Sequence, residues 1–343
     1  MKLLYISLAS CLFLSCTNKK ASDQQKTTSP KKTSTEKTTS ADTLTETETD
    51  DYLTPPKSDI RVYDLSQFDS RVLISLSDDY VLSSHKDSLA IPDLKNFEEE
   101  ESQYLPLGLK YKKVMMSKMK IAETDSLFIY DYSANMLNAF AVKDLNAAAY
   151  INIYGAEWPY EASDYMIGFE VETKSLKIPD SNYYTTFVCI GPKNPFAMKK
   201  LQTIKWKEIA ASKIPSVPVN PKYNRFMKGT TKKNAYSYTN GDLQYFLQDY
   251  AEKEDVTGRR LLVENKTTHE IVFENYYYND EGGALTPLNF INPDGEIHQW
   301  TGKLFKNKSD VVFGFEYASF GCSTIPFISK TEPVIFRSCD NRH

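Results

Sequence analysis

Short runs of aromatic and branched side chains, separated by turn residues, constrain the fold of this chain more than any other feature. Residues 126–132 and 136–142 flank Ser133-Ala134-Asn135, and residues 260–265 and 270–275 flank a second short connection. Runs of this length and composition are typical of strands, and two of them around a short turn predict an antiparallel hairpin. We therefore expect a mainly β protein with few helices, built from antiparallel modules of sandwich or barrel-like type.

Other segments follow the same pattern. Further strands are predicted at residues 165–171, 183–190, 289–291, 296–300 and 311–317, with a turn at Asn292-Pro293-Asp294-Gly295 between the third and the fourth. A single fair helix is predicted at residues 242–254, because Leu243, Phe246, Leu247 and Tyr250 recur at helical spacing.

Three prolines within residues 214–221 exclude a regular helix or central strand there, so we place a domain boundary at this segment. It divides the folded part into two β-rich domains, residues 59–213 and 222–343. The triplet Gly-Phe-Glu occurs in both halves, at Gly168 and at Gly314, within a similar order of predicted strands. An internal duplication and a chance match both remain open.

The amino terminus carries an export signal. Met1-Lys2 is positive, residues 3–15 are apolar or small, and Cys16 precedes the polar Thr17-Asn18-Lys19-Lys20. Such a run is too short to span a bilayer permanently. With a cysteine at its end, the segment resembles the lipobox of bacterial lipoproteins.

The resemblance implies that residues 1–15 are a removed signal peptide and that Cys16 carries lipid, with acyl chains such as palmitate holding the protein to a membrane. Cleavage before Cys11 is an alternative, since residues 8–11 match the usual lipobox letters better but leave only about eight apolar residues upstream. An ordinary secretory signal and a non-exported apolar terminus are further alternatives.

Residues 16–58 are predicted to form a disordered tether of Thr, Ser, Lys and acidic residues, because they lack the apolar surface that offsets conformational entropy. The lysines lie near the anchor and the acidic residues far from it, so the segment is expected to act as a spacer. We expect a cell-envelope location, at the outer membrane of a Gram-negative bacterium, facing the periplasm or the surface. The formal charge of -4, without a basic stripe, argues against a nucleic-acid partner.

Three cysteines remain after the signal region. Cys322 and Cys339 are predicted to pair as a disulfide across two short strands, the alternative being two buried thiols, and Cys189 is left as a buried free thiol. No Cys-x-x-Cys motif is present. Met115, Met116 and Met119 are predicted to fill core space rather than to bind copper. We expect no metal and no cofactor.

The sequence holds four histidines and lacks the motifs His-Glu-x-x-His, Gly-x-Ser-x-Gly and the phosphate-binding glycine loop. We therefore favour a non-enzymatic protein. Its 23 Tyr, 18 Phe and 3 Trp are explained first by aromatic pairing between strands, and a platform for a glycan or peptide ligand is the alternative. The candidate ligand-contact residues are Trp158, Tyr160, Tyr276, Tyr278, His298 and Trp300.

Three functions follow as expectations. The first is a lipid-anchored envelope protein with a binding or assembly role, whose partner is an envelope protein or a glycan. The second is an envelope hydrolase that acts on glycan or peptide through paired carboxylates, which leave no linear motif. The third is an inhibitor or immunity lipoprotein.

Overall fold

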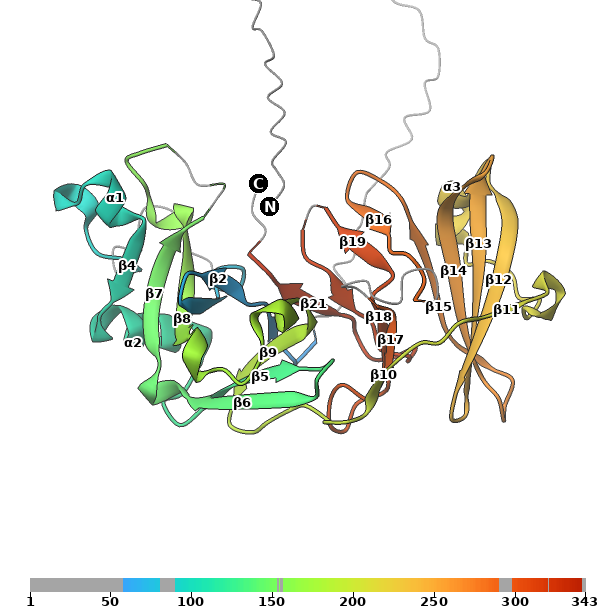
Figure 1. The fold of residues 1–343 in the computed structure, drawn as a ribbon, viewed down its shortest axis with the longest axis horizontal. Helices are drawn as coiled ribbons and strands as arrows, with labels where there is room; N and C mark the ends of the chain where they lie inside the picture. The colour runs from blue at the N-terminus through green and yellow to red at the C-terminus, as the bar shows by residue number, and fades with distance from the viewer. Residues whose placement is uncertain are drawn as a thin grey trace, which may run out of the picture. The chain divides into compact units, whose positions relative to one another are not determined.

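The structure is a computed structural model that describes residues 58–80, 90–152, 154, 157–289, 298–319 and 321–340. The predicted signal peptide, Cys16, nearly all of the tether and the turn at residues 292–295 lie outside the described residues. Within the described ranges, strands predominate and form several open sheets, mostly antiparallel, rather than a closed barrel. The expected mainly β fold class is therefore confirmed (Figure 1).

The first sheet has six strands in the order β20 (Thr324–Ile325), β21 (Ile335–Ser338), β1 (Val62–Tyr63), β9 (Thr186–Gly191), β5 (Ser126–Asp131) and β6 (Met136–Ala141). The second has five, in the order β2 (Ser66–Phe68), β3 (Arg71–Ser75), β8 (Tyr165–Glu172), β7 (Asn146–Ile151) and β4 (Tyr104–Leu107). The only parallel pair recorded between the described strands joins β1 to β21.

A third sheet has the order β11 (Lys207–Ile209), β12 (Thr231–Asn240), β13 (Leu243–Glu252), β14 (Asp255–Asn265) and β15 (Ile271–Tyr278), and its four long strands lie side by side in Figure 1. Two small sheets complete the set: β10 (Leu201–Thr203), β17 (Trp300–Gly302) and β18 (Val311–Phe313), and the pair β16 (Gly283–Leu285) and β19 (Glu316–Ala318).

Helices are short in the part of the chain described. The α-helices are α1 (Glu99–Ser102), α2 (Leu109–Met119) and α3 (Asn224–Met227). Short 3-10 helices occur at η1 (Leu94–Asn96), η2 (Val142–Asp144), η3 (Ala162–Asp164), η4 (Thr173–Ser175), η5 (Asp180–Thr185), η6 (Ala211–Lys213) and η7 (Pro221–Tyr223).

Both predicted hairpins are confirmed. Strands β5 and β6 pair from Ser126 with Ala141 to Asp131 with Met136, and β14 pairs with β15 from Gly258 with Tyr278. The strand expected at residues 311–317 is instead two strands, β18 and β19, that belong to different sheets. Gly314 separates them with a φ of +91°, a backbone conformation that residues other than glycine rarely adopt.

The helix predicted at residues 242–254 is wrong, because this segment is strand β13. Asn240 and Leu243 pair across the two-residue loop Gly241-Asp242, where Gly241 has a φ of +57°. The Gly-Asp turn closes a hairpin with β12, and cross-strand pairing on both sides outweighs the helical spacing of four apolar residues. Tyr245 and Leu247 then alternate into the core, as a strand requires.

Helix α2 was not expected, although its buried residues follow helical spacing. Lys112, Met115, Met116 and Met119 are its buried positions, and the three methionines belong to a core cluster, as predicted. The Nζ of Lys112 donates to three backbone carbonyls around η2 at 2.6 to 3.1 Å. These hydrogen bonds allow Lys112 to lie on the buried face of α2 beside the methionines, although the sequence gives a charged residue at this position.

The proline-rich segment at the predicted domain boundary is packed against the third sheet. Arg260 of β14 donates to the carbonyl oxygens of Val217 and Pro218, and Val219 packs on a cluster that contains Tyr223 and Tyr250. Pairing of β1 with β21 also joins the first predicted half to the second, and residues Leu53–His343 form one compact unit. Independent folding of residues 59–213 and 222–343 stays a prediction.

Candidate functional site

A cleft of about 740 Å³ brings together residues that are far apart in the sequence. Strand β2 and its flanking residues contribute to one part of the lining, β19 to another, and the disulfide-linked segment around β20 and β21 to a third. The lining residues are Asp64, Leu65, Ser66, Gln67, Phe68, Tyr132, Asn152, Tyr154, Met166, Tyr183, Tyr184, Phe187, His298, Phe313, Gly314, Glu316, Tyr317, Ala318, Gly321, Cys322, Ser323, Thr324, Ile325, Arg337, Cys339 and Asp340.

Exposed tyrosines are concentrated in this lining. Tyr154, Tyr184 and Tyr317 are 56%, 65% and 40% exposed, and all three line the cleft. They are half of the six exposed large apolar side chains found among the described residues. Tyrosine offers a broad apolar face and a hydroxyl at little conformational cost, which suits it to contact with a partner.

A charge pair fixes one wall of the cleft. Arg337 on β21 donates from Nε and Nη2 to Asp64 Oδ1 at 2.9 and 2.6 Å, and from Nη1 to Ser323 Oγ at 2.6 Å. Its guanidinium also stacks over the ring of Phe187, 4.9 Å from the centroid. Burial raises the pKa of Asp64, and the adjacent Arg337 opposes that rise. These contacts hold the side chains of Asp64 and Arg337 in the wall of the cleft.

Glu316 is the other distinctive ionisable group. By accessible area it is exposed on β19, yet protein atoms around it displace enough hydration to raise its pKa to about 7. The backbone N–H of Tyr278 donates to Glu316 Oε1 at 3.3 Å and opposes the rise, while Asp280 adds to it. The protonation state of Glu316 therefore changes near neutral pH.

The cysteine pairing predicted from the sequence is present. Cys322 and Cys339 form a disulfide with their Cα atoms 5.6 Å apart, and both line the cleft. Cys189 is a buried free thiol, again as predicted, and burial raises its pKa far above its usual range. The disulfide ties β20 to β21, so it holds the wall that carries Arg337.

The predicted contact residues in the second half fall into different environments. His298 lines the cleft and its Nδ1 lies 3.2 Å from Asn289 Oδ1. Trp300 is buried in a core, in edge contact with the ring of Tyr132 at 5.2 Å. Tyr276 is also buried, and Tyr278 stacks on Phe226 with the ring centroids 4.0 Å apart. Of these four, His298 alone belongs to the cleft.

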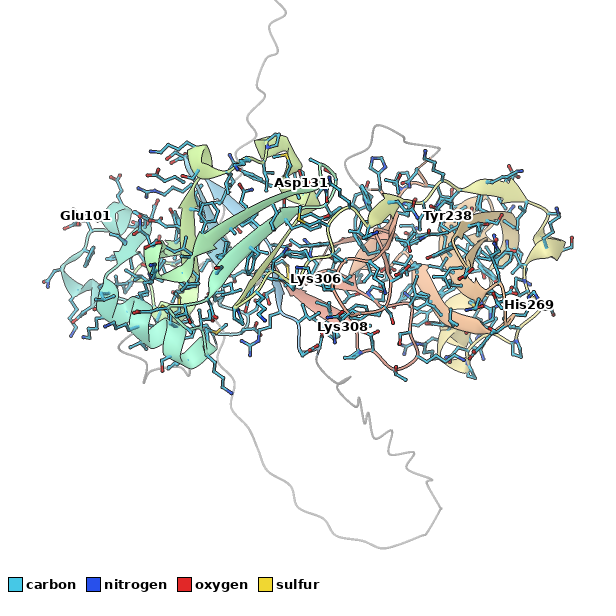
Figure 2. All side chains as sticks on the ribbon, turned by 90° about the horizontal axis from the view of Figure 1, so that it is seen from below. Glu101, Asp131, Tyr238, His269, Lys306 and Lys308 are labelled. Atoms are coloured by element: carbon cyan, nitrogen blue, oxygen red, sulfur yellow. A yellow bond between two sulfur atoms is a disulfide. The ribbon has the colours of Figure 1, made fainter. Side chains whose placement is uncertain are left out.

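Trp158 and Tyr160 line a second hollow of about 540 Å³, away from the residues of the cleft. Their rings meet edge to face at 5.4 Å, and Lys95 and Asp93 contribute charged groups. His269 is 80% exposed in the β14–β15 turn, where Figure 2 labels it, and its Nδ1 lies 2.6 Å from Glu264 Oε1.

Several cleft residues were not identified from the sequence, chiefly Tyr154, Tyr184, Tyr317 and Arg337. The local sequence does not distinguish them, because a tyrosine in a strand-rich sequence is flanked by similar residue types whether its side chain is exposed or buried. Among the described residues, no group of three or more His, Cys, Asp and Glu side chains is arranged to hold a metal ion. No described helix has the length and apolar character needed to cross a membrane.

Comparison with known proteins leaves the site to be interpreted from its own geometry. No protein-family model, curated protein or solved structure matches this chain.

Proposed function

We propose that this protein is a lipid-anchored lipoprotein of the cell envelope that binds an envelope component in the cleft, without catalysing a reaction. The observation that carries the binding role is the gathering of Tyr154, Tyr184 and Tyr317 in one cleft. The resemblance of the amino terminus to a lipobox, with Cys16 as the acylated residue, supports the anchored location. Several acyl chains together anchor a protein where one chain would bind only marginally.

The carboxylates of the cleft favour binding over hydrolysis. Three line it: Asp64, Glu316 and Asp340. Asp64 is held by Arg337, and Asp340 Oδ2 accepts a hydrogen bond from Ser75 Oγ. A glycosidase or a related hydrolase needs two carboxyl groups that face the substrate and exchange protons with it. With two of the three committed to structural contacts, Glu316 is left as a single acid.

Substitution of the cleft tyrosines tests the binding role. The full anchored chain is cross-linked in its own envelope and purified, and the partner recovered with wild type is quantified for the triple variant Tyr154→Ala, Tyr184→Ala, Tyr317→Ala. Recovery is expected to fall at least tenfold. A matched control replaces Leu109 and Phe336, two exposed apolar residues outside the cleft lining, with alanine. Equal recovery by the tyrosine variant and the control would remove the basis for the proposal.

Acylation is tested separately with the two cysteines of the amino terminus. Cys16→Ser is expected to abolish metabolic fatty-acid labelling and detergent-phase partitioning, whereas Cys11→Ser is expected to leave both intact. Labelling lost only in Cys11→Ser would shift the anchor to that residue. Unchanged labelling in Cys16→Ser, with the protein dissolved in the cytosol, would contradict the anchored location.

A further inference from the structure

Several strands that line the cleft lie at the edges of their sheets, among them β2 and β19. Strand β2 is the last strand of its five-stranded sheet, and β19 pairs only with β16 in the described part of the chain. An edge strand carries backbone N–H and C=O groups that can pair with a further strand. All three residues of β19 are exposed.

The hydrogen bonds of β19 identify which backbone groups point away from β16. Thr286 N–H donates to the Phe315 carbonyl and Ser319 N–H to the Gly282 carbonyl, each at 2.9 Å. Bonded and non-bonded pairs alternate along an antiparallel ladder. Glu316 and Ala318 therefore direct their N–H and C=O groups toward the open edge.

The charge of the cleft indicates the charge of the polypeptide segment that would pair with β19. Among the described lining residues, Arg337 and Asp64 form an ion pair and offset each other, so Asp340 and the ionised form of Glu316 leave an excess of negative charge. Glu316 lies on the open edge itself, and the exposed Tyr317 follows it. A polypeptide strand with a lysine or arginine side chain satisfies the backbone groups and this charge together.

We propose that the partner presents an extended, basic polypeptide segment, which adds to β19 as a further strand and places a cationic side chain beside Glu316. This inference rests on the proposed binding function of the cleft and specifies its ligand. Main-chain hydrogen bonds with Glu316 and Ala318 give the register, and Tyr317 covers the added strand.

The test uses a displayed library of random twelve-residue peptides, selected on the immobilised full chain in detergent. Enriched peptides are synthesised, and their affinities are measured by fluorescence anisotropy. We expect sequences that alternate branched or aromatic residues and carry at least one lysine or arginine. Ala318→Pro removes one outward N–H donor and is expected to weaken binding about tenfold. Glu316→Gln is expected to weaken it several-fold at low salt and little at high salt.

Ala139→Pro is the matched control. Ala139 is exposed on β6, an edge strand whose residues do not line the cleft. Val142 N–H donates to the Asp125 carbonyl at 2.9 Å, and the same alternation directs the N–H of Ala139 outward. This variant is expected to bind within twofold of wild type. Thermal unfolding of each variant verifies that it folds.

Failure of this inference can be distinguished from failure of the proposed function. If the tyrosine variant loses its envelope partner but no peptide is enriched, or enriched peptides bind Ala318→Pro unchanged, strand addition is overturned and the binding role stands. Displacement of the native partner by soluble envelope glycans, equally from wild type and Ala318→Pro, would also overturn it in favour of a glycan ligand. If the tyrosine variant retains the native partner, the binding role itself fails.

Discussion

Removal of the Cys322–Cys339 disulfide is expected to destabilise the protein by an amount that follows from its place in the chain. The two cysteines are separated by 17 positions, and they join β20 to β21 in the wall of the cleft. For a loop of this size, the loss of loop-closure entropy in the unfolded chain stabilises the folded state by about 3 kcal/mol. At the sensitivity typical of large domains, this corresponds to a lowering of the melting temperature by about 6 °C.

The measurement is thermal unfolding of the wild type and of the variants Cys322→Ser, Cys339→Ser and the double variant, each with and without reductant. Either single substitution breaks the same bond, so the two single variants and the double variant are expected to lose nearly equal stability. Reductant is expected to lower the melting temperature of the wild type and to leave that of the double variant unchanged. Additive losses from the two single substitutions, or a wild type insensitive to reductant, would refute the reasoning.

Three further predictions concern buried charge, close packing and pH. Arg259→Met is expected to lower the free energy of unfolding, measured with denaturant, by about 3–5 kcal/mol, because the buried Asp249 loses its hydrogen bond from Arg259 Nε at 3.0 Å. A double variant that also carries Asp249→Leu should regain most of this stability. A double variant no more stable than Arg259→Met would contradict the account. Gly168→Ala should destabilise by about 3 kcal/mol or more, since its Cβ would lie 1.9 Å from a carbonyl oxygen of β3, whereas Gly191→Ala, which meets no atom within 4 Å, should be nearly neutral in thermal unfolding. Folding raises the pKa of Glu316 from 4.5 to about 7, so the folded state binds more protons than the unfolded state between these pH values. The free energy of unfolding should therefore fall as pH rises through this range. In Glu316→Gln that fall should be absent, and a variant with the same pH profile as the wild type would show that the carboxyl does not titrate as described.

The hairpins and the cysteine pairing were predictable from the sequence because their information is local. A turn between two runs of branched and aromatic residues determines the β5–β6 and β14–β15 pairs, and the two cysteines flank a segment short enough to double back. Strand β13 shows the limit of local spacing. Its apolar residues fit a helix, but the Gly241 turn and the neighbouring strands on both sides determine its conformation.

The candidate site depends on contacts that no local pattern encodes. Trp300 and Tyr276, both expected at a contact surface, are buried, whereas Tyr184 and Tyr317 are exposed in the cleft. An aromatic side chain in a strand fits either environment, and the choice depends on which distant segment covers it.

The sequence by itself predicted that this chain is mainly β, where the β5–β6 and β14–β15 hairpins turn, and that Cys322 and Cys339 lie close enough to pair, because strand periodicity, turn chemistry and short loop closure act between near neighbours. Only the tertiary structure decided that β1 pairs with β21, that Arg337 meets Asp64, and that β19 lines a cleft together with Tyr154 and Tyr184. The physical reason is that burial, strand partners and the environment of a charge depend on segments that are hundreds of residues apart along the chain.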